Sequence, residues 1–331
     1  MKRMFVAVAA VALLCLCVAA QGVSIETVTV GDPGNAADTR YASPGYGAVS
    51  YTYNIGKYEV TAAQYVEFLN AKAKTDPYGL YDTSMGDTTA YQGCNIQRSG
   101  SSGGYSYSVA SGWANRPVNY VSFWDACRFA NWLNNGQGDG DTESGAYTLT
   151  PAGISNNTIT RNTGCRWAVT SEDEWYKAAY YKGGGTSAGY WDYATQSNAA
   201  PASQVLPTDP GNSVNYYTYT SGYSVGSPYW RTNVGEFENS VSAYGTFDQS
   251  GNVYELNEAI ISEAYRGLRG GSFWDNDYHS LQASNRLIFP TPGFSDLGFR
   301  VAEAVPEPSS LLALSAGGLG LLLAWRRRRG S

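Results

Sequence analysis

Helical periodicity is confined to three stretches of this 331-residue chain, and all of them lie before residue 186. They read VTAAQYVEFLNAKAK (60–74), VSFWDACRFANWLNN (121–135) and TSEDEWYKAAYYKGGG (170–185). Each stretch starts with a residue suited to capping a helix: Thr61, Ser122, and either Thr170 or Ser171. Asp125, three residues after Ser122, fits a capping box. The sequence therefore predicts two to three helices, and the rest of the chain has to fold as strands and loops.

The segments outside these helices are rich in turn-forming residues. Residues 23–55 alternate apolar and polar side chains and predict short antiparallel strands, whereas residues 75–112 predict a long irregular excursion. Residues 183–304 contain short strand-like runs among Gly, Asn, Tyr and Trp. No change of composition divides residues 23–304 into two units, so we expect one α+β domain of low regular structure.

Overall charge excludes one class of partner. The formal net charge is −6 and the isoelectric point is about 4.9. A nucleic-acid-binding surface needs clustered positive charge, so we expect no nucleic-acid partner.

Both ends of the chain have the composition of targeting segments. Residues 1–20 combine a basic start, an apolar run and small residues before Gln21, which predicts a secretory signal peptide. Residues 305–331 contain an apolar run followed by four arginines, Arg326 to Arg329. This run is short for a spanning helix, and the arginines favour retention on the cytoplasmic side.

The C-terminal segment resembles the PEP-CTERM sorting signal of Gram-negative bacteria. It carries Val305-Pro306-Glu307-Pro308, then the apolar run and then the arginine cluster, in that order. The resemblance implies export, at least transient anchoring in the membrane, processing by an exosortase and association with extracellular polysaccharide. A plain tail anchor is the alternative.

Three cysteines remain after removal of the signal peptide: Cys94, Cys127 and Cys165. An oxidising compartment permits at most one disulfide among them. Cys127 falls within a helical apolar pattern and is expected to be buried and inert. If a disulfide forms, Cys94 and Cys165 are the expected pair.

Six segments of the chain, in this order, resemble the formylglycine-generating enzyme, or sulfatase-modifying factor, family. They are Ile55–Asn70, Arg116–Leu133, Cys165–Gly183, Tyr244–Ala259, Arg266–Asp277 and Gly298–Glu303. The resemblance spans residues 21–304. It implies one irregular α+β domain related to C-type lectin-like folds and stabilised by calcium.

The family resemblance implies calcium ligands in the stretch FDQSGNVYELNEAI (247–260). Asp248 and Glu255 match positions that give side-chain oxygens, and Gly251 and Val253 match positions that give carbonyls. Mixed carboxylate and carbonyl oxygens are what calcium prefers. Without the resemblance, a β-turn in which Asp248 bonds its own backbone is the simpler interpretation.

A second calcium site would map near Asn215 and Tyr216, where no partner acid is identifiable.

The catalytic residues of the family are not matched. Its enzymes use oxygen and copper held by two cysteines, and the corresponding positions here carry Asp275 and Ser280. Cu(I) needs thiolate ligands, and a carboxylate and a hydroxyl are hard donors. We therefore expect neither a copper centre nor formylglycine-generating activity.

The chain also lacks the histidines for a related iron chemistry. The ergothioneine-biosynthesis iron enzymes of a sister branch use several histidines, and this chain has one, His279. Asp275, Asp277 and His279 alternate in sequence and suggest a metal clasp, although a solvated acidic loop is the simpler interpretation.

Aromatic loops suggest a binding role. GYSYSVASGW, GYWDYATQ and NYYTYTSGYSVGSPYW concentrate Tyr and Trp, which binding surfaces favour. The same residues are equally suited to fill the core of a helix-poor domain. We expect an exported binding or structural module with polysaccharide or an envelope protein as partner. The alternative is an active metal-dependent oxidoreductase of the family.

Overall fold

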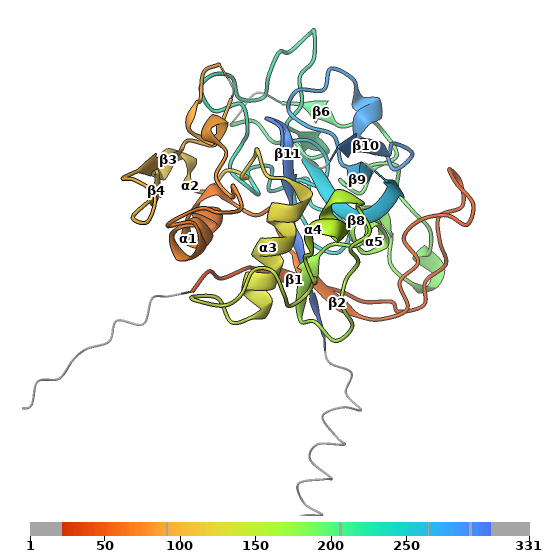
Figure 1. The fold of residues 1–331 in the computed structure, drawn as a ribbon. Helices are drawn as coiled ribbons and strands as arrows, with labels where there is room; N and C mark the ends of the chain where they lie inside the picture. Colours follow the sequence, from red (N-terminus) through yellow and green to blue (C-terminus); the bar gives the residue numbers. More distant parts are fainter. Residues whose placement is uncertain (1–21, 91, 205–206, 264, 291–292, 306–331) are drawn as a thin grey trace, which may run out of the picture.

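A computed structural model describes residues 22–90, 92–204, 207–263, 265–290 and 293–305 (Figure 1). The predicted signal peptide and the C-terminal sorting segment lie outside these ranges. Within them, no helix combines the length and the apolar character needed to cross a membrane.

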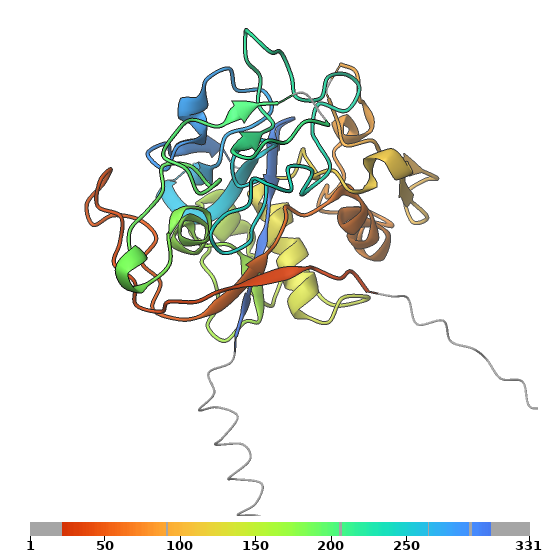
Figure 2. The same cartoon turned by 180° about the vertical axis from the view of Figure 1, so that it is seen from behind.

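Two four-stranded sheets form the centre of the molecule. The first has the order β1 (Thr27–Val30), β2 (Tyr53–Gly56), β12 (Val301–Ala304), β5 (Trp167–Val169). The second has the order β10 (Leu287–Pro290), β9 (Tyr265–Arg269), β8 (Tyr254–Ser262), β11 (Leu297–Phe299). Only Arg300 separates β11 from β12, so consecutive strands of one segment belong to different sheets. This segment is the long blue strand that runs down the middle of the molecule in Figures 1 and 2.

The strand pairings are mostly antiparallel, as expected from the sequence. Two are parallel, β11 with β8 and β6 (Ala202–Ser203) with β7 (Ser213–Val214). In the β8–β9 hairpin, Glu255 lies opposite Arg269, and the register shifts after Asn257. Arg300 directly follows Phe299, which lies opposite Leu256 of β8.

The three predicted helices are confirmed, and so are their caps. They are α1 (Ala62–Lys72), α3 (Phe123–Asn134) and α5 (Glu172–Tyr180). Thr61, Ser122 and Ser171 each accept a hydrogen bond from the third backbone N–H of their helix, and each forms a capping box. The local sequence alone therefore determined where these helices begin.

The segment predicted to be irregular contains more structure than expected. Residues 75–112 include η1 (Thr83–Gly86), a hairpin of β3 (Ile96–Ser99) and β4 (Ser106–Val109), and the start of α2 (Ser111–Ala114). Three further short helices are α4 (Pro151–Ser155), η2 (Gly185–Ser187) and η3 (Tyr278–Leu281). The strands of the hairpin are too short and polar for a clear periodicity, and Asn70 of α1 holds β4 through two hydrogen bonds to Tyr107.

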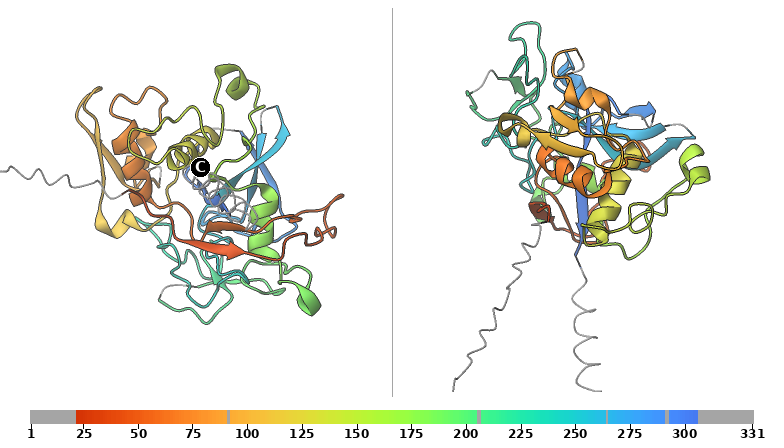
Figure 3. Two further views of the ribbon diagram at one scale, coloured as in Figure 1. Left: turned by 90° about the horizontal axis from the view of Figure 1, so that it is seen from below. Right: turned by 60° about the vertical axis from the view of Figure 1, so that its left-hand side comes forward.

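The main hydrophobic core lies between the helices and the sheets. Phe68 of α1 packs edge-on against Phe129 of α3, and Phe129 in turn packs against Phe299 of β11. The left panel of Figure 3 shows α1 and α3 on one side of β1, and the loops that follow η2 on the other. The two sides of the molecule therefore differ in regular structure.

Four fully buried arginines hold the loop-rich side to the rest of the chain: Arg231, Arg266, Arg269 and Arg300. Each donates hydrogen bonds to at least two main-chain carbonyls, and those that Arg231 and Arg300 reach are far away in sequence. Arg300, for example, contacts the carbonyls of Gly56 and Phe247 at 2.9 Å. Buried carbonyls need a partner, and here guanidinium groups supply it where helix and sheet do not.

Candidate functional site

The stretch from Phe247 to Ile260 forms a tight turn followed by β8. Asp248, Gly251 and Asn252 have φ angles of 60°, 84° and 62°, in the left-handed region. A side chain at Gly251 would bring its Cβ within 2.4 Å of the Asn215 carbonyl oxygen, so only glycine fits there. The turn thus brings together the segments of both predicted calcium sites.

The Asp248 side chain is half-buried within this turn. Its Oδ2 accepts a hydrogen bond from the backbone N–H of Gly235 at 2.6 Å. Burial raises the pKa of Asp248 to about 6. A simple β-turn predicts that the Asp248 side chain bonds its own backbone. In the structure it bonds the backbone of Gly235 instead.

Glu255 does not fit as a calcium ligand in this arrangement. The Arg300 guanidinium donates to both of its carboxylate oxygens at 2.6 Å, and the Trp175 indole N–H donates to Oε2 at 2.8 Å. Both side chains of the ion pair are fully buried. The carboxylate charge is already compensated, and a cation would have to displace Arg300 to reach it.

Asn215 and Tyr216 are also buried. The Asn215 amide donates to the Trp230 carbonyl and to Asn252 Oδ1, both at 3.0 Å. Among the described residues, Asn215 Oδ1 has no hydrogen-bond partner. An orphaned amide oxygen fits a cation site, and the carboxylate that would complete it is not among the matched residues. Calcium therefore stays a prediction.

The two residues at the family's cysteine positions lie near each other. Asp275 Oδ1 accepts a hydrogen bond from Tyr254 at 3.0 Å, and Oδ2 accepts from the backbone N–H of Ser272 at 2.6 Å. The Ser280 side chain lies near both Asp275 and Tyr254 and lowers the pKa of each. Burial raises the pKa of Asp275, and these hydrogen bonds oppose the rise. The two residues are near each other and offer only oxygen donors, and their match to the cysteine positions of the family stays a prediction.

The alternating acids near His279 do not assemble a metal clasp. Throughout the described ranges, no three His, Cys, Asp or Glu side chains group in a way that could hold a metal ion. His279 is 59% exposed, and its ring lies 3.9 Å from Asp277. This loop is solvated.

A group of exposed and half-buried aromatic rings lies beside Asp275, and we call it the aromatic patch: Tyr217, Tyr219, Tyr223, Trp230 and Trp274. Tyr223 is its centre, with ring centroids 4.8 Å from Tyr217, 4.9 Å from Trp230 and 6.2 Å from Trp274. Trp274 and Tyr219 are 51% and 80% exposed. The Tyr217 N–H donates to the Asp275 carbonyl, which connects the patch to the Asp275–Ser280 pair. Four of the five residues come from one predicted aromatic loop.

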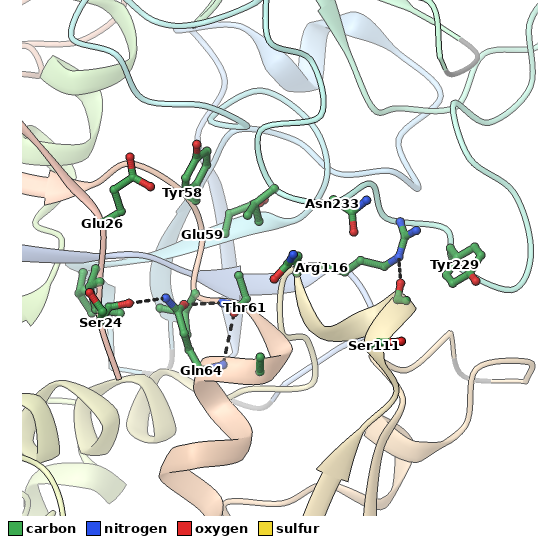
Figure 4. Close-up of a pocket in the computed structure, with 17 residues that line it drawn as sticks. Ser24, Glu26, Tyr58, Glu59, Thr61, Gln64, Ser111, Arg116, Tyr229 and Asn233 are labelled. Atoms are coloured by element: carbon green, nitrogen blue, oxygen red, sulfur yellow. Dashed lines mark hydrogen bonds between the residues drawn. The ribbon is translucent and has the colours of Figure 1, made fainter. Parts of the chain in front are cut away.

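A separate cavity of about 880 Å³ lies on the side of α1 where its N-terminus meets α2 (Figure 4). Glu59 lines it and is 1% exposed. Sequence reasoning did not single out Glu59, although an acid between Tyr58 and Val60 at the entrance to a buried helix is an available signal.

The cysteines are free, and the expected pair is not formed. Cys94 and Cys127 are fully buried in the main core, and Cys165 is half-buried beside a cavity near Ala304. Burial raises the pKa of all three thiols. The prediction that Cys127 is buried is confirmed.

Comparison with known proteins supports the fold. The solved structure titled "Crystal Structure of CarF" is similar at 21% identity and a TM-score of 0.55, covering 86% of this chain and 99% of that one. PvdO from Pseudomonas aeruginosa gives 18% identity and a TM-score of 0.46, covering 85% and 92%. Treponema denticola variable protein 1 gives 17% and 0.42, covering 84% and 94%. Among curated proteins, no sequence is significantly similar to this chain.

Two family models match the sequence. The PEP-CTERM protein-sorting motif matches residues 304–329 and indicates an exported protein of the Gram-negative envelope. The model described as the sulfatase-modifying factor enzyme 1-like domain matches residues 26–305. Both predicted resemblances and the predicted irregular α+β fold are confirmed. The chain therefore belongs to the family of sulfatase-modifying factor enzyme 1-like domains.

Proposed function

We propose that this protein is an exported binding module of its family that lacks formylglycine-generating activity and binds polysaccharide through the aromatic patch. The observation that carries the proposal is the proximity of Asp275 to Ser280, flanked by the aromatic patch, of which Tyr219 and Trp274 are exposed.

The loss of activity follows from ligand chemistry. Asp275 and Ser280 offer hard oxygen donors, and Cu(I) binds soft thiolates. The three cysteines of the mature chain lie outside the segment from Ser272 to Arg286. Two of them are fully buried in the core, where they cannot serve as a second, exposed thiol pair.

The binding role follows from the shape and polarity of the patch. Tyr and Trp rings present an apolar face with a polar tip, which suits a ligand that combines ring C–H groups with hydroxyls. The Asn276 amide donates to the Tyr219 hydroxyl at 2.9 Å and holds this exposed ring in place. A polysaccharide presents such a surface, and a protein sorted to the envelope meets polysaccharide there. Other proposed contacts are an exosortase at the sorting motif and the membrane through residues 305–331.

Affinity electrophoresis in gels that contain dextran, β-glucan or galactomannan tests the binding role. We expect retardation of the wild-type protein by at least one of them, and about tenfold weaker binding for Trp274→Ala. Tyr78→Ala is the matched control, because Tyr78 is 46% exposed and is not part of the patch. Equal binding of both variants, or no retardation in any gel, contradicts the proposal.

A copper experiment tests the loss of activity. Wild-type protein, Cu(I) and a cysteine-containing sulfatase-type peptide are expected to give no aldehyde by mass spectrometry. The double variant Asp275→Cys/Ser280→Cys is expected to bind one Cu(I) in competition with a chromogenic chelator, because these two positions are near each other. Aldehyde formation by the wild-type protein would establish the alternative, an active oxidoreductase.

A further inference from the structure

The two loops that carry the aromatic patch contain few charged residues. Residues 215–230 have none, and Arg231 follows directly. The second loop, residues 272–280, has three titratable side chains: Asp275, Asp277 and His279. The ligand charge that the patch accepts therefore depends on a small set of groups.

The cations next to the first loop are engaged within the protein. Arg231 is fully buried, and its guanidinium donates to the carbonyls of Gln92 and Gly93 at 2.8 and 3.0 Å. Arg116, which donates to the Arg231 carbonyl, is also buried. Guanidinium groups are the usual partners of carboxylates. Neither of these two is available to a carboxylate on a ligand at the patch.

Asp277 is an exposed acid beside the patch. Its side chain is 52% exposed, and it follows Asn276, whose amide holds the Tyr219 hydroxyl at 2.9 Å. Burial raises the pKa of Tyr216, and the Asp277 charge adds to that rise, so these two side chains are near each other. Asp275 is a second, half-buried acid. A polymer that carries carboxylates is therefore repelled at the patch, and salt weakens the repulsion.

The first loop also borders a cavity of about 440 Å³ with an uncharged lining. Tyr217 and Tyr219 belong to the patch, whereas Thr218, Thr220 and Ser221 line the cavity. The other lining residues are Ala202, Ser203, Gln204, Thr208 and Tyr216. Hydroxyls and amides pair with the hydroxyls of a sugar, whereas a carboxylate placed there loses water without gaining a cation. A glycan that extends from the patch across this loop meets polar, uncharged groups.

We infer that the site formed by the aromatic patch and this cavity selects an uncharged polysaccharide, and that Asp277 disfavours polymers that carry carboxylates. The inference rests on the proposed function, because it names the class of ligand that the same site takes. A neutral glycan gains the ring contacts and hydrogen bonds of the site without the repulsion.

Depletion of the protein from solution by polymer beads tests the inference. Beads of cross-linked dextran, β-glucan and galactomannan are compared with carboxymethylated beads of the same polymers, at about 20 mM salt. The experiment is made at pH 8, where an imidazole is ordinarily unprotonated, because the His279 ring lies 3.9 Å from Asp277. We expect wild-type protein to bind the neutral beads about fivefold more tightly, with a smaller difference at about 0.5 M salt.

Asp277→Asn removes the charge and keeps an acceptor for the His279 N–H. It is expected to raise binding to the carboxymethylated beads about threefold and to leave binding to the neutral beads unchanged. Glu238→Gln is the matched control, because Glu238 is exposed, lies outside the patch and the cavity lining, and changes the net charge by the same amount. It is expected to leave binding to both kinds of bead unchanged.

Equal binding of wild-type protein to both kinds of bead, or tighter binding to the carboxymethylated ones, overturns the inference and leaves the proposed function standing. Equal gains in Asp277→Asn and Glu238→Gln also overturn it, because net charge would then be the cause. Binding to neither kind of bead contradicts both the inference and the proposed function. The comparison of the beads on wild-type protein holds even if a variant fails to fold.

Discussion

The helix-bearing part of the molecule and its loop-rich part satisfy their backbone polar groups in different ways. In the first, Ser122 and Ser171 cap α3 and α5 from neighbouring positions in sequence. In the second, Arg300 and Arg231 reach carbonyls far away in sequence. A cap acts locally and is replaceable, whereas a buried guanidinium joins several segments at once. The difference predicts that the loop-rich part is the more sensitive to single substitutions.

The largest effect is expected from Arg300→Met. It leaves Glu255 buried without its partner and frees the carbonyls of Gly56 and Phe247. We expect the free energy of unfolding to fall by about 3–5 kcal/mol, measured by urea denaturation. Arg166→Ala is the control, since Arg166 is 71% exposed in its ion pair with Glu303, and a loss below about 1 kcal/mol is expected. If both variants lost a similar free energy of unfolding, buried arginines would matter no more than exposed ones, and the prediction would be wrong.

A second effect concerns the pH dependence of stability through Asp248. Its pKa is raised from 3.8 to about 6 in the folded state, so folding binds the proton more tightly. Its contribution to stability is full below pH 4 and is lost as pH rises through about 6. Asp248→Asn keeps an acceptor for Gly235, and we expect it to be more stable than wild type at pH 7 by up to about 3 kcal/mol.

Urea denaturation of both proteins between pH 4 and pH 7 measures this difference, which should vanish at the acid end. The sign of this stability difference also tests calcium binding. A calcium ion bound by Asp248 would make Asp248→Asn the less stable protein at pH 7.

A smaller effect is expected from the caps. Ser122→Ala removes the acceptor for the Asp125 N–H and should cost about 1 kcal/mol in the free energy of unfolding. Ser122→Thr retains the hydroxyl and should recover most of that loss. A cost near that of Arg300→Met would show that caps and buried arginines matter equally.

The smallest effect is expected from metal removal. Arg300 and Trp175 occupy the oxygens of Glu255, so treatment with a chelator should shift the melting temperature by less than about 2 °C. Elemental analysis accompanies the melting curves. A fall of several degrees together with one bound calcium would show that calcium competes with Arg300, and would confirm the site implied by the family resemblance.

Parts of the candidate site could be predicted from the sequence. Asp275 and Ser280 lie five residues apart, so their proximity could be expected from the sequence. The tyrosine-rich loop was recognised as a binding candidate. Its meeting with Trp274 was not predictable, because that contact joins residues 51 positions apart in a region without periodicity. Glu59 was missed for a similar reason, since its unmet oxygen depends on the distant residues that surround it.

The sequence by itself determined the three main helices, their caps, the family and the C-terminal sorting motif, because each depends on residues close together in the chain or on a matched order of motifs. Tertiary structure alone decided that Arg300 pairs with Glu255, that the cysteines stay free, and that Glu59 lines a cavity. These outcomes depend on which distant segments pack together in the interior. There, an unpaired buried charge costs so much free energy that each charged group must have a partner.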